Sequence, residues 1–215
     1  MSINTPLIFS TPTNKTLSIT NRFLKRSFDL IVSLLGLILF TWLLVILYIL
    51  ATFDTQQNGF FLQKRVGKNG KLFHTIKLRT MRNLPTIRTN VTTATDPRIT
   101  RLGSFLRKTK LDELPQLINV LFGQMSLVGP RPDVPGFADR LTGTDQIILT
   151  VRPGITGPAT LAFRHEEQLL AEQEDPERYN REVIYPEKVR LNREYIENYQ
   201  FAKDLYYIRK TIIRI

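Results

Sequence analysis

An uninterrupted apolar stretch near the N-terminus restricts the folds open to this chain more than any other feature. It runs from Leu30 to Phe53 without a charged residue. Its roughly 24 residues are enough to cross a bilayer as a helix. A buried core helix of this length would normally show a polar face, and none is present. We therefore expect a membrane-inserted helix over residues 21–54, preceded by a flexible tail over residues 1–20 that is rich in Ser, Thr, Asn and Pro.

Cations flank this stretch on both sides. They are Arg22, Lys25 and Arg26 before it, and Lys64, Arg65, Lys68 and Lys71 after it. Because basic flanks favour the cytoplasmic side of a membrane, both ends are expected on that side, as a re-entrant helix would allow. Gly36 and Thr41 are the candidate break points, since the stretch contains no proline. A single crossing is the alternative, with the larger basic part over residues 55–215 fixing the cytoplasmic side.

Charge and residue usage narrow the class of function. The chain has 30 Lys+Arg against 19 Asp+Glu, a net charge of +11, which points to an anionic partner such as nucleic acid, an anionic membrane surface or a phosphorylated substrate. It has no cysteine and only two histidines, which lie far apart. These counts exclude disulfides, thiolate chemistry and Cys-based zinc sites, and they argue against a His-centred triad.

The part after the membrane segment predicts a helix-rich α/β fold with a small β-hairpin. Residues 60–73 form the hairpin around an Asn69-Gly70 turn, and residues 74–81 alternate as a strand that carries Lys77 and Arg79 on one face. That pair of cations is either a solvated face or a phosphate-binding pair.

Two stretches have the pattern of helices that lie on an anionic membrane surface. They are residues 97–108 and 201–215, in which apolar positions at helical spacing alternate with Lys and Arg. For residues 97–108, a core-packed helix with a basic outer face explains the pattern nearly as well. A further helix is expected over residues 187–199, opened by Pro186.

The centre of the chain carries two adjacent carboxylates, Asp112 and Glu113, just before Pro115. Proline is tolerated in the first turn of a helix, so a helix is expected to begin near Leu111 or Asp112. The acids would then lie at the positive end of its dipole. Two interpretations remain open: helix capping, or a reactive carboxylate that the dipole and nearby cations keep ionised.

The chain combines a membrane segment, arginines in rigid proline-containing loops and a pair of acids. This combination suggests phosphate chemistry at a bilayer. Asp112 could attack phosphorus and form an acyl-phosphate, while Glu113 could hold Mg²⁺. Arg107, and Arg131 between two prolines, could clamp phosphate oxygens. Arg152 lies in another turn-rich loop, residues 151–158. The chain contains no P-loop, no GxGxxG and no kinase signature.

Several motifs, in this order, resemble the bacterial sugar transferase family, the monotopic phosphoglycosyl transferases. They are Lys25-Arg26-Ser27-Phe28-Asp29, Gln63-Lys64-Arg65-Val66-Gly67, Lys77-Leu78-Arg79-Thr80-Met81, Arg98-Ile99-Thr100-Arg101-Leu102-Gly103, Leu111-Asp112-Glu113-Leu114-Pro115-Gln116-Leu117, Met125-Ser126-Leu127-Val128-Gly129-Pro130-Arg131-Pro132 and Arg152-Pro153-Gly154-Ile155-Thr156-Gly157. The resemblance is clear from Lys25 to Gly157 and weaker beyond.

This resemblance implies transfer of a sugar-1-phosphate from a UDP-sugar to undecaprenyl phosphate, with release of UMP, as the first membrane step in exopolysaccharide, O-antigen or capsule assembly. It implies that Asp112 is the nucleophile, that a covalent aspartyl-phosphosugar intermediate forms, and that Mg²⁺ is required at Asp112 and Glu113. A later acidic family position falls on Glu182. With the cations above, the candidate substrate- and phosphate-binding residues are Arg107, Arg131, Lys77, Arg79, Arg152 and Glu182.

The chain departs from the family pattern in two places. Thr41-Trp42 stands where the family has the Ser-Pro pair that breaks its re-entrant helix. Pro158 to Arg164 replaces the usual Trp-Ala-Gln-Val-Asn-Gly-Arg run.

The expected location is the bacterial inner membrane with residues 55–215 on the cytoplasmic face. UDP-sugar, undecaprenyl phosphate and membrane lipid are the expected partners, nucleic acid is not, and a homodimer is left open. The alternative is a membrane-tethered basic protein that binds anionic lipid or nucleic acid.

Overall fold

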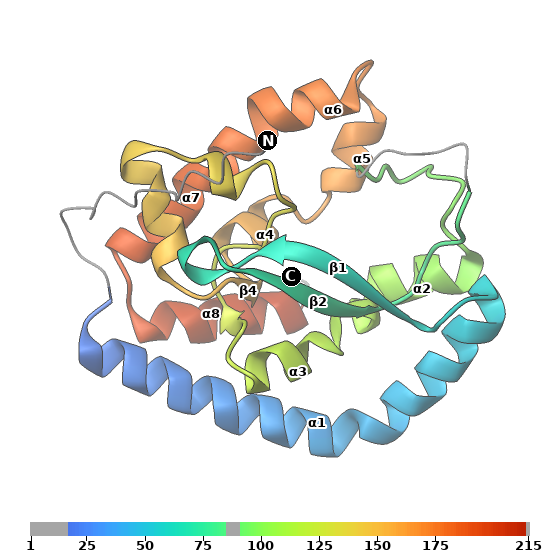
Figure 1. Cartoon of the computed structure of the whole chain (residues 1–215), viewed down its shortest axis with the longest axis horizontal. Helices are drawn as coiled ribbons and strands as arrows, with labels where there is room; N and C mark the ends of the chain where they lie inside the picture. The colour runs from blue at the N-terminus through green and yellow to red at the C-terminus, as the bar shows by residue number, and fades with distance from the viewer. Residues whose placement is uncertain (1–16, 85–90, 214–215) are drawn as a thin grey trace, which may run out of the picture.

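The computed structural model describes residues 17–84 and 91–213, so most of the predicted tail over residues 1–20 lies outside the described residues. Figure 1 shows one long N-terminal helix along an edge of the molecule, with shorter helices and a β-hairpin gathered on one side of it. This arrangement confirms the predicted helix-rich α/β class with its apolar N-terminal helix. The proposed division at residue 54 stays a prediction.

The helices and strands follow one another with short connections. The α-helices and strands are α1 Ile19–Thr55, β1 Phe60–Val66, β2 Leu72–Leu78, α2 Arg101–Thr109, α3 Gln116–Leu121, β3 Ser126–Val128, β4 Gly154–Thr156, α4 Pro158–Ala162, α5 Glu166–Ala171, α6 Pro176–Tyr179, α7 Tyr185–Glu197 and α8 Phe201–Ile212. The 3₁₀ and π turns are η1 Lys68–Gly70, η2 Leu111–Glu113, η3 Ala138–Arg140, η4 Gly143–Thr150 and η5 Asn180–Ile184.

Helix α1 is continuous over 37 residues, yet it changes direction near its middle (Figure 1). The hydroxyl of Thr41 donates a hydrogen bond to the carbonyl of Leu37 at 2.5 Å, and such bonds often bend helices. Gly36 allows the close approach of α3 at this point, because a Cβ there would lie 2.9 Å from Leu117 Cδ1. The bend therefore forms without a proline.

Both halves of α1 pack on the rest of the chain. In the N-terminal half, the Arg26 guanidinium donates to the carbonyls of Val120 and Leu121 at 2.7 and 3.0 Å. In the C-terminal half, Leu47 packs with Leu78 of β2 and Leu106 of α2. The opposite face of the helix exposes a continuous set of large apolar side chains: Ile31, Leu34, Leu35, Ile38, Leu39, Trp42, Val45, Ile46, Ile49, Leu50 and Phe53. A helix with this exposed face associates with a membrane.

A buried polar cluster joins α1 to the C-terminal helices. Asp204 of α8 is 1% exposed and receives three hydrogen bonds. The ammonium of Lys25 donates at 2.6 Å, the hydroxyl of Tyr195 at 2.5 Å and the hydroxyl of Tyr199 at 3.0 Å. Because the cluster is buried, it fixes the position of α1 against α7 and α8.

The Asp204→Asn variant is expected to lower the free energy of unfolding by about 3 kcal/mol, since it leaves the Lys25 ammonium buried without a counter-charge. Thermal unfolding of the purified protein in detergent would measure this loss. The control is Glu197→Gln, which removes a carboxylate that is 46% exposed and lies 3.9 Å from Arg193. Equal stability of the two variants would show that the cluster does not hold α1.

The hairpin is confirmed, but its second arm is longer than predicted. Strands β1 and β2 pair antiparallel from Phe60 opposite Leu78 to Val66 opposite Leu72. The turn uses positive φ at Asn69 (57°) and Gly70 (72°), as a tight hairpin requires. The strand expected separately over residues 74–81 is the second part of β2, which already ends at Leu78. The parallel pair β3–β4 was not predicted, because three-residue strands are too short to show alternation.

The two basic amphipathic stretches form helices that are partly buried and partly exposed. Helix α2 begins at Arg101, after Thr100 caps it, rather than at residue 97. Leu106 is completely buried while Phe105 is 54% exposed, so α2 is both a core helix and a carrier of exposed apolar surface. Helix α8 likewise exposes Leu205 and Ile212. Contact of these side chains with lipid stays a prediction.

Candidate active site

The paired acids lie in a short 3₁₀ turn rather than inside a long helix. Helix α2 ends at Thr109, the following Lys110 reverses the chain with a φ of 62°, and η2 then holds Asp112 and Glu113. The α-helical part, α3, starts only at Gln116, after Pro115. Asp112 and Glu113 are 7% and 6% exposed, so both acids are buried. Neither side chain is the hydrogen-bonding cap of a helix in the structure.

Two cations compensate the charge of Glu113. Its Oε1 accepts hydrogen bonds from Arg131 Nη2 at 2.8 Å and Lys77 Nζ at 3.1 Å. Burial by itself would raise the pKa of Glu113, but Arg131 and Lys77 outweigh burial and hold that pKa well below its usual range. Glu113 is therefore ionised at neutral pH. Both bonds use Oε1, which leaves Oε2 without a hydrogen bond to the described residues.

Asp112 has the opposite environment. Burial, followed by the neighbouring charge of Glu113, raises the pKa of Asp112 above its ordinary value. Its Oδ1 is buried and has no hydrogen-bond partner within residues 17–84 and 91–213. Buried polar atoms are normally satisfied, so this orphaned carboxylate oxygen is a candidate partner for an ion, a water or a substrate. The sequence predicted an ionised Asp112, whereas the strongest compensation in the structure goes to Glu113.

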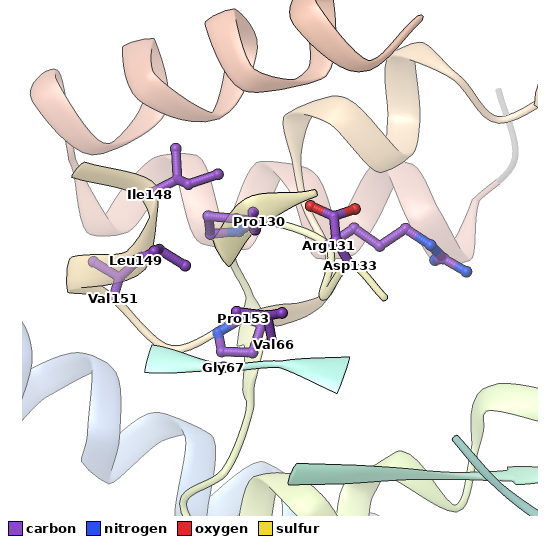
Figure 2. A pocket seen from close by; sticks show the side chains of 10 residues that line it. Val66, Gly67, Pro130, Arg131, Asp133, Ile148, Leu149, Val151 and Pro153 are labelled. Carbon is purple, nitrogen blue, oxygen red and sulfur yellow. The ribbon is translucent and has the colours of Figure 1, made fainter. Parts of the chain in front are cut away.

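The loop of Pro130 to Asp133 fixes the position of Arg131. Its backbone is held at three points: the Pro130 carbonyl accepts from Gly154 N at 2.8 Å, the Pro132 carbonyl from Arg65 Nη1 at 3.0 Å, and the Asp133 carbonyl from Val66 N at 2.9 Å. Figure 2 shows Pro130 among apolar side chains of η4 and β1, with the Arg131 side chain extending away from them. The prolines and these bonds make Arg131 a pre-positioned cation.

A cavity of about 610 Å³ adjoins cations that surround the acid pair, while Asp112 and Glu113 themselves are not among the residues that line it. Arg107, Lys110 and Arg131 line it, and their positive charges favour the ionised form of the acid pair. Arg107 donates to the Thr80 hydroxyl at 3.4 Å and is paired with Glu167 of α5. The cavity thus has a cationic wall next to two buried carboxylates, which suits a phosphate-bearing ligand.

The structure brings together some of the sequence-predicted site residues and separates others. Lys77, Arg107 and Arg131 are grouped around Asp112 and Glu113. Three candidates lie elsewhere. The side chain of Arg79 donates to the carbonyls of Asn58 and Phe60, Arg152 donates to the carbonyl of Gly123, and Glu182 is an exposed partner of Arg178. None of these three lines the cavity.

Other residues of the cavity were not singled out from the sequence. Tyr185, Lys188 and Asn192 of α7 and Thr160 of α4 also line it. The three α7 positions are spaced by three and four residues, which places them on one helix face. That spacing was visible in the sequence, but it does not distinguish a ligand-binding face from a core-facing one.

The acid pair is the candidate metal position. Within the described ranges no cluster of three or more His, Cys, Asp or Glu side chains could hold a metal ion by itself. Mg²⁺, however, is commonly held by one or two carboxylates together with substrate phosphates. The orphaned Oδ1 of Asp112 and the unbonded Oε2 of Glu113 are oxygen donors of the type that Mg²⁺ prefers, so the residues fit such an ion.

These features define a membrane-associated α/β protein with a cationic, phosphate-compatible cavity beside a buried acid pair. The model of the family described as "Bacterial sugar transferase" matches residues 20–215. The chain belongs to this family, and the predicted family is confirmed.

Named relatives agree with this assignment. The chain is 33% identical over 204 residues to "Exopolysaccharide production protein ExoY" of Sinorhizobium fredii, covering 87% of this chain and 83% of the relative. It is 35% identical to "Undecaprenyl-phosphate galactose phosphotransferase" of Salmonella typhimurium, over 89% of this chain and 40% of the relative. It is 37% identical to "UDP-glucose:undecaprenyl-phosphate glucose-1-phosphate transferase" of Escherichia coli, over 82% of this chain and 38% of the relative. The chain therefore spans about two fifths of the length of several curated relatives that it matches.

Proposed function

We propose that this protein transfers a sugar-1-phosphate from a UDP-sugar to undecaprenyl phosphate, releases UMP, and so initiates the assembly of a bacterial surface glycan. The observation that carries the proposal is Asp112: a buried carboxylate with an orphaned oxygen beside a cation-lined cavity. Relatives with over 30% identity whose names describe undecaprenyl-phosphate sugar transfer support the same chemistry.

The reaction proceeds in two displacements at one phosphorus atom. In the first, an oxygen of Asp112 attacks the phosphorus that bears the sugar, the bond to UMP breaks, and UMP leaves with its electron pair. In the second, an oxygen of undecaprenyl phosphate attacks the same phosphorus and the bond to Asp112 breaks. The aspartate is regenerated, and the product is a lipid diphosphate that carries the sugar.

The cations of the site have separate tasks in this scheme. Arg131, held by its proline-bracketed loop, and Arg107 would bind the phosphate oxygens on which negative charge increases during each displacement. Lys77, which is partly buried, stays on Glu113 and fixes that carboxylate. Glu167 is paired with Arg107 in this structure, so phosphate binding would replace that contact.

We propose that Mg²⁺ binds at Asp112 and Glu113. When bound, the ion would neutralise phosphate charge and favour the ionised form of Asp112. The chain's own contribution is a rigid pair of oxygen donors: Glu113 is held by two cations, and Asp112 is adjacent to it on the same 3₁₀ turn.

We propose further that the protein lies on the cytoplasmic face of the inner membrane, with α1 as a re-entrant helix. The packing of both halves of α1 on the same body supports this topology, as do the basic residues on both flanks. Exposed Phe105 and Phe122, the latter 76% exposed, would extend the apolar surface that α1 presents to lipid.

Purified protein in detergent with Mg²⁺, undecaprenyl phosphate and a panel of UDP-sugars tests the function. We expect release of UMP with at least one sugar and a lipid-linked sugar diphosphate in equal amount. Binding of anionic vesicles or nucleic acid without UMP release from any sugar would favour the basic binding protein instead. Release of UDP rather than UMP would contradict the displacement at the sugar-bearing phosphorus.

A further inference from the structure

The cavity has a second wall of a different chemical kind, formed mainly by helix α7. Tyr185, Lys188, Val189 and Asn192 line it. Their spacing of three and four residues places them on one face of α7. Helix α4 packs against α7 and adds Thr160 to the same cavity. This wall is mostly uncharged, in contrast to the wall of Arg107, Lys110 and Arg131.

Three polar side chains on this wall lack partners. The hydroxyls of Tyr185 and Thr160 and the Oδ1 of Asn192 are buried and make no hydrogen bond within residues 17–84 and 91–213. Asn192 is only 5% exposed. An unpartnered buried polar group destabilises a fold, and most such groups in proteins are satisfied. Because the three residues also line the cavity, a ligand bound there can supply partners after small side-chain rotations.

The chemistry of these groups matches the hydroxyls of a sugar. Two hydroxyls and a carboxamide can each donate and accept, as sugar hydroxyls do. They offer no charge to a phosphate, and the nearest cation on this wall, Lys188, is already held by both oxygens of Glu166 at 2.7 Å. Val189, Ile148 and Ala159 provide apolar surface beside them for the C–H face of a ring.

Position also favours the sugar over the nucleoside. The sugar is bonded directly to the phosphorus that Asp112 is proposed to attack, so it must lie next to the cations that hold this phosphate. Asp133 links the two walls. The charges of Arg131 and Lys188 both lower the pKa of its carboxyl, and its own charge raises the pKa of Tyr185, so all of these groups lie close to Asp133. The α7 wall is thus adjacent to the cationic wall and not remote from it.

We propose that Asn192, Tyr185 and Thr160 form the subsite that binds the sugar ring of the nucleotide-sugar donor and selects among sugars by hydrogen bonds to its hydroxyl or amide substituents. The proposal rests on the proposed function, because it takes a UDP-sugar as the ligand of the cavity.

Three shape-conserving variants test it: Asn192→Leu, Tyr185→Phe and Thr160→Val. Each removes a hydrogen-bonding group that has no partner among the described residues, so each should keep the thermal stability of the wild type or raise it. Each is expected to lower kcat/KM for the preferred UDP-sugar by roughly tenfold or more. The inhibition constant of UMP should change by less than about twofold, since UMP lacks the sugar. Tyr206→Phe is the control, because Tyr206 is 52% exposed on α8.

The sugar panel separates selectivity from general damage. In the variants, the preference between UDP-sugars that differ at one hydroxyl should shrink, because the group that distinguishes them is gone. An equal rise in the inhibition constant of UMP would assign the subsite to the nucleotide. Unchanged kcat/KM for all sugars would overturn the proposal, and a marked loss of thermal stability would show a structural role.

Binding measurements keep this test independent of turnover. If the wild type released no UMP from any sugar, the proposed function would fail. Calorimetry with UDP-sugar and with UMP would still decide whether the subsite exists. Asn192→Leu should weaken the binding of UDP-sugar and leave the affinity for UMP unchanged. Equal affinities for UDP-sugar in the variant and the wild type would contradict the subsite.

Discussion

The Asp112→Asn variant is expected to abolish turnover, with a loss of about 10⁴-fold or more, as for other covalent nucleophiles. Asparagine has nearly the same shape, but its amide cannot form the acyl-phosphate. The covalent phosphosugar adduct should also disappear, which mass spectrometry of the protein after incubation with UDP-sugar alone would show. Membrane association should be unchanged, because α1 is not altered.

The same variant should fold as well as the wild type. Oδ1 of Asp112 makes no hydrogen bond to the described residues, so the substitution breaks none there. Burial raises the pKa of Asp112, so the folded state holds this proton more tightly than the unfolded state does. The contribution of Asp112 to stability therefore falls as pH rises above the ordinary range of an aspartate. Near neutral pH the variant should be equally or more stable in thermal unfolding.

Asp145→Asn is the matched control, since Asp145 of η4 is paired with Arg193 of α7 and neither residue lines the cavity. It should keep activity within about twofold, as surface substitutions usually do. Full turnover by the Asp112→Asn variant, or a phosphosugar adduct on that variant, would show that Asp112 is not the nucleophile. The acid pair would then have a structural role.

The Glu113→Gln variant is expected to lower kcat/KM by about 10²-fold or more, because two partly buried cations lose their common counter-charge. Arg131 would no longer be held on Glu113, so its position relative to the phosphate would change. The concentration of Mg²⁺ required for half-maximal rate should rise. Titration of Mg²⁺ against the rate of UMP release would measure both effects, and an unchanged Mg²⁺ dependence would exclude Glu113 as a metal ligand.

Stability should respond to pH in the opposite sense at this residue. The pKa of Glu113 is depressed, so its ionised form stabilises the fold above the ordinary glutamate range, and this stabilisation is lost as pH falls through the depressed value. The glutamine variant lacks this stabilisation and should be less stable than the wild type at neutral pH. The difference in stability between the two proteins should be smaller at acidic pH. Glu187→Gln, which alters an exposed pair with Arg190, should show neither effect.

Local patterns were sufficient for the elements that depend on nearby residues. The apolar run over residues 30–53 predicted the exposed face of α1, and Asn69-Gly70 predicted the hairpin turn, because turn geometry depends on the residues in it. Pro186 predicted the start of α7 to within two residues. The ordered motifs gave the family, since each one carries many residue identities at once.

Partnership between distant residues could not be predicted in this way. Lys77 and Arg79 alternate with one residue between them, yet Lys77 reaches Glu113 while Arg79 binds carbonyls at the base of the hairpin. The bend of α1 depends on Thr41 together with the approach of α3 at Gly36, and no proline signalled it. Such contacts join segments far apart in the sequence, where no local pattern constrains them.

The sequence alone therefore determined the membrane helix, the acid pair and the family, because each is encoded in contiguous residues. Only the tertiary structure decided which acid the cations compensate, that Asp112 keeps an orphaned oxygen, and that Thr160 shares a cavity with Tyr185 and Asn192. Burial and charge act through space, and both depend on how the packed helices exclude water from these side chains.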